Sequence, residues 1–307
     1  MRFAYLVLIF PPLIWAGNYV VGRAIGDQIA PLNLAFWRWF LAALIVLPFV
    51  LKPIWQQRQL IRQHLVALLF ISITGISAFN TLAYIGLQST SVTNGSLFNS
   101  LIPIFIIILS RLFFNISGTT QQVWGIFISF FGVLLILSQL SLDKLINLSF
   151  NQGDLWMLVA GIDWAIYSIL LKHHRPPEIS NFTLLGITII LGCIILFPIY
   201  LWNPWNEPTP QFNQDVILAL AYVVIFASLI AFFAWNYALA KVDAHIGGQF
   251  VHLLPIFGAI LGMIFLGESL QIYHLIGGGL IAVGLLLSLN AFNFLVRPQR
   301  IQDKQLD

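Results

Sequence analysis

The sequence contains ten apolar runs of about twenty residues each, and these runs restrict the fold more than any other feature. A helix needs about 20 residues to cross the roughly 30 Å hydrocarbon core of a bilayer, so each run is long enough to span a membrane. Only 8% of the residues are charged, whereas soluble proteins carry about 25%. The chain is therefore predicted to be an all-α integral membrane protein with ten transmembrane helices. The runs cover residues 3–22, 32–51, 65–87, 92–112, 121–140, 153–172, 182–202, 216–239, 244–266 and 271–294.

The distribution of basic residues predicts how the chain lies in the membrane, because cytoplasmic loops hold most lysines and arginines. With the N-terminus inside, eleven of the 14 basic residues fall in cytoplasmic segments and two, Arg23 and Lys144, in external ones. The first run imitates a secretory signal, but it continues to Val21 without a small-x-small cleavage site, so we expect an uncleaved helix. Both termini are expected in the cytoplasm, and the chain in the plasma membrane, which is the inner membrane of a bacterium.

A constant offset of 152 residues relates the two halves of the chain, which predicts that they are two copies of one structural repeat. The repeats are expected at residues 1–142 and 150–296, with five helices each, followed by a cytoplasmic tail at 297–307. Because five is odd, the second repeat starts from the opposite side of the membrane. Such inverted repeats are typical of transporters that open a midplane site to the two sides in turn. The matching pairs include Gly95 and Gly247, Phe98 and Phe250, Pro103 and Pro255, Gly125 and Gly277, and Gly132 and Gly284.

Short motifs along the chain, taken together, resemble a known family. They are Trp15-Ala16-Gly17-Asn18, Phe36-Trp37-Arg38, Gly153-Asp154-Leu155, Trp164-Ala165-Ile166-Tyr167, Trp235-Asn236-Tyr237-Ala238-Leu239, Leu254-Pro255 and Leu266-Gly267-Glu268. In order and spacing they resemble the EamA-type transporters of the drug/metabolite transporter superfamily, whose members have ten helices in two five-helix repeats. The resemblance implies a secondary transporter, often an exporter, of amino acids or other small metabolites, with a central cavity between the halves.

The sequence departs from that family pattern at two positions. Both repeats of the family commonly end their fourth helix with Gly-Glu, but Ile116 stands at the offset from Glu268. The residue before the sixth-run tryptophan is usually apolar, and here it is Asp163. Because His252 likewise corresponds to Ser100, the second half is expected to hold most of the ionisable chemistry.

Asp163 lies about ten residues into the sixth run, which places it about 15 Å deep at 1.5 Å per residue. An aspartate at the bilayer centre costs about 2.5–3.5 kcal/mol, so a cation, a proton or water must compensate it. The functional interpretation is that Asp163 binds a cationic group of the substrate or carries a coupling proton. The alternative is a buried carboxylate that is hydrogen-bonded to neighbouring helices.

Arg38 lies about 10 Å in from the outer face, and three interpretations are open. Its long stem can extend outward to water. Alternatively, its guanidinium points inward and binds a substrate carboxylate, or it pairs with Asp163. With Arg38 on the carboxylate and Asp163 on the ammonium, the cavity would suit a zwitterion such as an amino acid.

Further candidates extend this site. Tyr167 is four residues after Asp163 and shares its helical face. His252 titrates near neutral pH and is a candidate proton carrier, or else an interhelical hydrogen-bonding group. The aromatic candidates can form cavity walls or simply pack. The candidates beyond Asp163 and Arg38 are Asn18, Tyr84, Ser100, Trp164, Tyr167, Trp235, Asn236 and His252.

Pro103 and Pro255 lie near the middle of their runs, where a proline removes a backbone hydrogen bond and kinks the helix. A kinked pair at corresponding positions of two inverted halves points to the binding site. The plain alternative is that both prolines only shape the packing.

The function classes left by these patterns are a transporter, a passive channel or structural subunit, and an intramembrane enzyme. The enzyme is disfavoured because the chain lacks HExxH, GxSxG and a second aspartate at membrane depth. No spacing typical of a metal or cofactor site occurs, and the small positive charge gives no reason to expect nucleic acid. The expected partners are a small-molecule metabolite and the lipid bilayer, with protons as one candidate coupling ion. The sequence does not give the substrate, the direction of transport or the oligomeric state.

Overall fold

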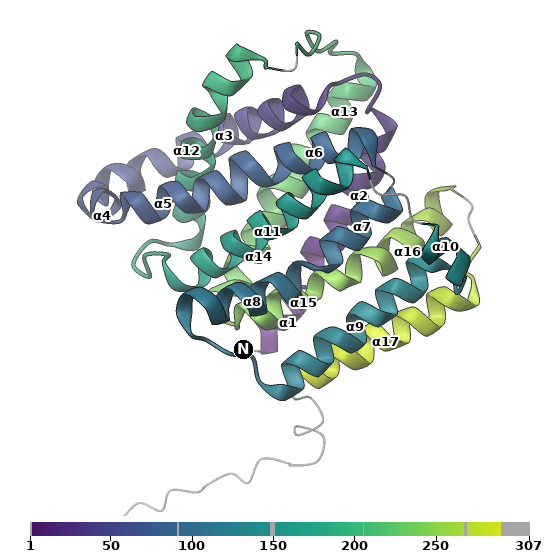
Figure 1. The fold of residues 1–307 in the computed structure, drawn as a ribbon. Coiled ribbons are helices and arrows are strands. Elements are labelled where there is room, and N and C mark those ends of the chain that lie inside the picture. The colour runs from purple at the N-terminus through teal and green to yellow at the C-terminus, as the bar shows by residue number, and fades with distance from the viewer. Residues whose placement is uncertain (1, 91, 148–150, 205, 267–268, 290–307) are drawn as a thin grey trace, which may run out of the picture.

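The computed structural model describes residues 2–90, 92–147, 151–204, 206–266 and 269–289, and within these ranges all regular structure is helical (Figure 1). The elements before the midpoint are α1 (Arg2–Val7), α2 (Phe10–Ala24), α3 (Pro31–Gln56), α4 (Arg58–Gln63), α5 (Leu65–Ser72), η1 (Ile73–Ala78), α6 (Phe79–Ser89), α7 (Val92–Ser100), α8 (Ile102–Phe114), α9 (Thr120–Ser138) and α10 (Leu142–Ile146). Those after it are α11 (Gln152–His173), α12 (Asn181–Trp202), α13 (Gln214–Tyr222), η2 (Val223–Ile230), α14 (Ala231–Leu239), α15 (Ala244–Gln249), η3 (Phe250–Leu253), α16 (Leu254–Leu266) and α17 (Ile272–Ser288). Glu268 and the expected tail at 297–307 lie outside the described residues.

Eight of the described helical segments are long and apolar enough to cross a membrane. They span Phe3–Gly22, Pro31–Gln56, Leu65–Ser89, Thr120–Ser138, Gln152–His173, Asn181–Trp202, Gln214–Leu239 and Ala244–Leu261. Two further apolar helices, Ile102–Phe114 and Ile272–Ser288, are shorter. An all-helical membrane protein is therefore confirmed, while the count of ten spans stays a prediction.

Side-chain caps explain where several helices begin. The Asn151 side chain accepts a hydrogen bond from the Asp154 amide at 3.2 Å, and the Asp154 carboxylate accepts one from the Asn151 amide at 2.7 Å. This reciprocal pair satisfies two backbone donors that the first turn of α11 leaves free. The side chains of Ser180 and Asn213 each accept a backbone amide in the first turn of α12 and α13.

Glycines hold α9 and α17 in close contact, and Figure 1 shows the two helices side by side. A Cβ added to Gly125 would lie 2.5 Å from the Gly284 carbonyl oxygen, and one added to Gly132 would lie 2.6 Å from the Gly277 oxygen. The 152-residue offset relates Gly125 to Gly277 and Gly132 to Gly284. In the structure, however, each glycine contacts the counterpart of the other: Gly125 lies against Gly284, and Gly132 against Gly277. A two-fold axis between antiparallel helices produces this exchange.

Residues close to such an axis should touch their own counterparts, and two pairs do so. Ser129 Oγ donates to the Ile281 carbonyl oxygen at 3.3 Å, and the His252 ring Nε2 lies 2.8 Å from the Ser100 carbonyl oxygen. Both pairs are separated by 152 residues. These contacts agree with two related halves, and the boundaries of the repeats stay a prediction.

Helical irregularities also recur at corresponding positions. The π-helical segments η1 and η2 interrupt the third long helix of each half, at Ile73–Ala78 and Val223–Ile230. The fourth helices break as well, at Leu101 between α7 and α8, and at the 3-10 segment η3 before α16. Each break comes just before a proline, Pro103 or Pro255, because proline has no N–H to continue the helical hydrogen bonds. Irregular turns of this kind are frequent at functional sites.

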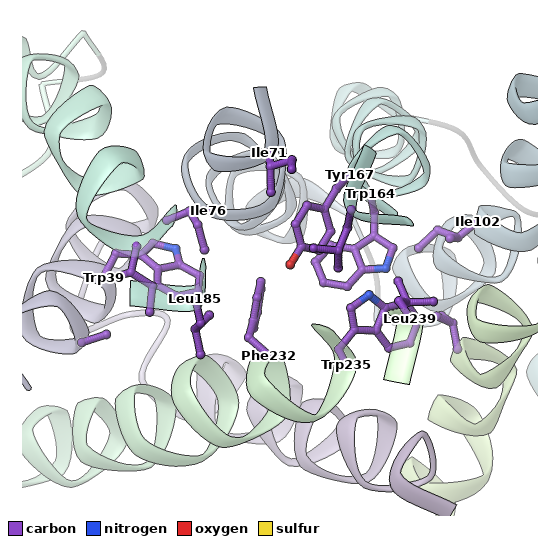
Figure 2. Packing of buried hydrophobic residues seen from close by; sticks show 14 of the residues in the cluster. Trp39, Ile71, Ile76, Ile102, Trp164, Tyr167, Leu185, Phe232, Trp235 and Leu239 are labelled. Atoms are coloured by element: carbon purple, nitrogen blue, oxygen red, sulfur yellow. The ribbon is translucent and has the colours of Figure 1, made fainter. Parts of the chain in front are cut away.

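Aromatic side chains fill the centre of the bundle. Trp39, Trp164 and Trp235 are fully buried, and Figure 2 shows Trp164 and Trp235 grouped with Tyr167, with Phe232 beside them. α12 packs along α3, and α11 packs along α6. The aromatic group therefore lies where helices of the first and second halves meet.

Candidate functional site

A vestibule enters the bundle from the face opposite the N-terminus and leads to a deep pocket. Their walls follow one face of α2, where Trp15, Asn18, Tyr19 and Gly22 are spaced three, four and seven residues apart. Gly22 lines the vestibule only, Trp15 lines the deep pocket only, and Asn18 and Tyr19 line both. The two spaces are thus the upper and lower parts of one path.

The wall formed by α6 shows the same order. Gln88 lines the vestibule, Tyr84 lines both spaces, and Asn80 and Phe79 line the deep pocket. The vestibule has a volume of about 770 Å³, whereas the deep pocket has only about 30 Å³. The path is therefore wide at its mouth and nearly closed at its inner end.

Aromatic rings in T-shaped and tilted contact close that inner end. The Trp15 ring lies 5.1 Å from Trp164 and 5.5 Å from Trp235, and Phe79 lies 4.5 Å from Trp164. Phe232 contacts Trp15 at 5.7 Å, and Figure 2 shows it beside Trp164 and Trp235. These side chains form an aromatic floor that separates the deep pocket from the N-terminal face.

Trp15 fixes this floor to the second half of the chain. Its indole N–H donates to the Ala227 carbonyl oxygen at 3.1 Å, and Ala227 belongs to the π-helical segment η2. The contact joins α2 of the first half to η2 of the second. A movement of one half against the other must therefore disturb the floor.

Arg38 is completely buried behind the pocket wall. Its Nη1 donates to Asn80 Oδ1 and to the Tyr84 hydroxyl, both at 2.7 Å, and its Nε donates to Ser228 Oγ at 2.9 Å. The guanidinium carbon also lies 4.7 Å from the centre of the Trp39 ring, a distance at which a cation is attracted to the ring face. The side chain does not extend outward to water, so the first of the three interpretations is wrong.

Two amides of the pocket wall keep groups without hydrogen-bond partners among the described residues. The Tyr84 hydroxyl contacts Asn18 Oδ1 at 3.4 Å, and the Asn99 amide donates to the Tyr19 hydroxyl. Asn80 Nδ2 and Asn99 Oδ1 are both buried and unpartnered. Both residues line the deep pocket, so its wall holds one buried donor and one buried acceptor without partners in this part of the structure.

Arg38 and Asp163 do not form a pair. The printed partners of Arg38 are the neutral groups of Ser228, Asn80 and Tyr84, and Asp163 makes no hydrogen bond within the described part of the chain. Asp163 also lines neither the vestibule nor the deep pocket, although its neighbour Trp164 does. Asp163 and Trp164 are consecutive residues of α11, so their side chains leave the helix in different directions, and only that of Trp164 reaches the deep pocket.

Tyr167 and Asn236 lie below the floor and bind each other. The Tyr167 hydroxyl donates to Asn236 Oδ1 at 2.5 Å, and Arg175 approaches the Asn236 carbonyl oxygen at 3.4 Å. Arg175 lies in the loop after α11, where burial lowers the pKa of its guanidinium and Tyr167 partly opposes that shift. Tyr167 and Asn236 thus support the floor from the N-terminal side. Neither they nor Trp235, which belongs to the floor, line the vestibule or the deep pocket.

His252 and Ser100 meet at the helix breaks rather than in the pocket. The break at Leu101 leaves the Ser100 carbonyl available to the His252 ring, whose Nδ1 has no partner among the described residues. The residues beside His252 on its segment, Val251 and Leu254, do line the deep pocket. The contact corresponds to the interhelical hydrogen bond that was one of the two interpretations of His252.

Of the predicted residues, the structure brings Asn18, Tyr84 and Trp164 together around the path. The sequence reasoning missed four polar residues near them: Tyr19, Asn80, Asn99 and Ser228. Asn80 had a usable signal, because it lies one helical turn before Tyr84. Most polar groups at the path belong to the first half, whereas the expectation that the second half holds most of the ionisable chemistry stays a prediction.

Comparison with known proteins agrees with this architecture. The model of the EamA-like transporter family matches residues 2–138 and again residues 151–290. The chain belongs to this family. The two matched segments meet near the middle of the sequence, close to the boundary expected from the 152-residue offset.

Relatives of the protein are named as transporters. The uncharacterized transporter YyaM of Bacillus subtilis is 27% identical, with 92% of each chain covered. An uncharacterized transporter of Archaeoglobus fulgidus is 28% identical, covering 92% of this chain and 96% of the relative. The uncharacterized inner membrane transporter YedA of Escherichia coli is 25% identical, covering 97% and 96%. This family member is thus a membrane transporter.

A solved crystal structure shows the same fold. Its TM-score with this chain is 0.75 at 15% sequence identity, over 97% of this chain and 100% of the other. At that identity the similarity speaks for the fold alone.

Proposed function

We propose that the protein is a secondary transporter that exports small metabolites by alternating access between two inverted repeats. The observation that carries the proposal is the blind path: it is open at one face, it narrows at Tyr84 and Asn18, and the aromatic floor closes it. A passive channel would need a continuous opening, so the blind path favours a carrier. In this proposal the protein lies in the plasma (bacterial inner) membrane with both termini in the cytoplasm. The vestibule then opens to the outside of the cell.

The contacts between halves support this mechanism. Arg38 and Trp15 of the first half bind Ser228 and Ala227 of η2 in the second half. Rocking of one half against the other would break these contacts, separate the floor and open the N-terminal face. Asn18, Tyr84 and Trp164 are the proposed contact residues for the solute, and Pro103 and Pro255 the positions at which the fourth helices bend.

Several other residues are proposed to act around the pocket rather than within it. Tyr167, Trp235 and Asn236 are proposed to fix the floor, and Ser100 and His252 to join the two halves at the axis. Asp163 is the proposed site of the coupling proton, because its carboxylate is largely buried and makes no hydrogen bond with the described residues.

Counterflow in proteoliposomes tests the carrier. Vesicles are loaded with a mixture of unlabelled amino acids, the class that the family resemblance implies, and the uptake of single radiolabelled amino acids is followed. A carrier gives saturable uptake that the internal solute accelerates several-fold. The reason is that a binding site loaded with internal solute returns to the outside and can then take up another labelled molecule. Asp163→Asn should keep counterflow but lose accumulation driven by a pH gradient.

Two results would contradict the proposal. Uptake that rises linearly with concentration and ignores the internal load would indicate a channel. Unchanged accumulation in Asp163→Asn would remove that residue from the coupling step while leaving the carrier intact.

A further inference from the structure

The charge of Arg38 has no opposite charge among its hydrogen-bond partners. The guanidinium is completely buried, its three bonded partners are neutral, and its Nη2 has no partner among the described residues. A buried cation costs several kcal/mol unless an anion approaches it. Hydrogen bonds and the Trp39 ring face offset only part of this cost.

The chemistry of the guanidinium also decides how Asn80 is turned. Arginine has donors only, so the side chain of Asn80 must present its carbonyl oxygen to Arg38. Its NH₂ group must then point away, and this nitrogen is buried without a partner among the described residues. Asn80 lines the deep pocket, so this unpartnered nitrogen lies buried in the pocket wall, beside the positive charge of Arg38.

No acidic side chain lines the deep pocket within the described residues, and in the vestibule the carboxylate is that of Asp27 at the mouth. Asp163, which would have received an ammonium group, lines neither space. The pocket is also lined by the aromatic side chains of Trp15, Phe79, Trp164 and Phe232. The pocket therefore combines aromatic residues with a polar wall in which the Asn80 donor lies next to Arg38 and the Asn99 acceptor has no partner among the described residues.

We propose that this pocket selects an organic monoanion: a carboxylate on a flat apolar body, without an ammonium group. The inference rests on the proposed transport function and narrows its substrate class. The carboxylate accepts the Asn80 N–H and supplies the negative charge that Arg38 lacks, while the body lies between the rings. Because the pocket now holds little more than a water molecule, the rings must part as the solute enters.

A matched set of indole compounds tests the charge preference. Indole-3-acetate is an anion at pH 7.5, indole-3-acetamide is its neutral counterpart, tryptamine is a cation and tryptophan a zwitterion. Affinities are measured by calorimetry on the full-length protein in detergent. We expect indole-3-acetate to bind at least about tenfold more tightly than each of the others, a difference of about 1.4 kcal/mol.

The variant Asn80→Asp supplies an internal carboxylate to Arg38 and removes the free donor. It should abolish the preference for indole-3-acetate, and a paired Arg38 should keep the protein folded, which the melting temperature verifies. Asn213→Asp adds the same charge in the outer loop, where aspartate can still cap α13, and should keep the preference.

Equal affinity for indole-3-acetate and indole-3-acetamide would overturn the inference. So would an unchanged ratio of these two affinities in Asn80→Asp. Binding of none of the four compounds would overturn it as well. These failures are distinct from failure of the transport proposal, which would show as an absence of counterflow both for amino acids and for indole-3-acetate.

Discussion

Arg38 decides the organisation of the site at the scale of single residues. Its three donors hold Asn80 and Tyr84 of the first half and Ser228 of the second in fixed positions. Three hydrogen bonds and the Trp39 ring offset part of the cost of a charge at this depth. Arg38 is therefore a positioning residue, and two of the groups that it orients, Asn80 and Tyr84, line the deep pocket.

Ser228→Ala should destabilise the protein because it leaves the Arg38 Nε buried without an acceptor. Loss of a buried partner costs about 1–3 kcal/mol. The matched control is Ser72→Ala, since Ser72 is equally buried but its hydroxyl only donates to the carbonyl of Leu68 in its own helix. Thermal unfolding in detergent should show a clear loss for Ser228→Ala and little for Ser72→Ala. Equal losses would show that the contact with Arg38 adds no stability.

At the scale of elements, the π-helical segments decide which residues face the path. A π turn contains an additional residue, so side chains after η1 are rotated relative to an uninterrupted α-helix. Asn80 and Tyr84 follow η1 directly, and Ser228 lies within η2. The two segments thus bring groups from both halves to Arg38.

The α9–α17 contact gives a prediction at the same scale. Gly277→Ala places a methyl group 2.6 Å from the Gly132 carbonyl oxygen, which cannot move without shifting α9. Overpacking of this kind costs about 1–3 kcal/mol, so the melting temperature should fall. Gly279 lies in the same helix with nothing within 4 Å of the added atom. Gly279→Ala should not lower the melting temperature, because alanine favours helix by about 1 kcal/mol. The reverse order would mean that the helices do not pack as described.

At the scale of the whole molecule, hydrogen bonds connect the two halves on the vestibule side, while the vestibule itself stays open. The Glu207 carboxylate, in the loop between α12 and α13, accepts the Leu32 amide at 2.9 Å and the Asn33 amide at 3.0 Å. These amides are unpaired donors in the first turn of α3, where an anion is stabilised. Glu207 therefore ties a loop of the second half to the rim of the vestibule, close to Pro31.

Thiol accessibility can follow the opening of this vestibule. Gly22 lines it and has space for a side chain, so Gly22→Cys in a Cys193→Ala background should react with a membrane-impermeant maleimide from the vestibule side. Ala160→Cys, which is completely buried, should not react. A solute that shows counterflow should change the rate of Gly22→Cys labelling several-fold, because transport moves the halves. A rate that does not respond to such a solute would contradict alternating access.

The sequence by itself determined the membrane-embedded helical fold, the family and the relation between the halves. These properties follow from hydrophobic run length, residue spacing and motif order, which are properties of the chain alone. The sequence alone also determined the helix breaks before Pro103 and Pro255, because a proline lacks the backbone N–H and interrupts the helical hydrogen bonds at its own position.

Only the tertiary structure decided which polar residues meet. Arg38 and Asp163 have similar estimated depths, yet Arg38 bonds Asn80, Tyr84 and Ser228 while Asp163 lies outside the path. The depth of a side chain in the membrane follows from counting residues along its helix. The direction in which the side chain points depends on the π turns and on the neighbours against which each helix packs. Those neighbours are distant in sequence, as the 190 residues between Arg38 and Ser228 show, so no local pattern could have selected them.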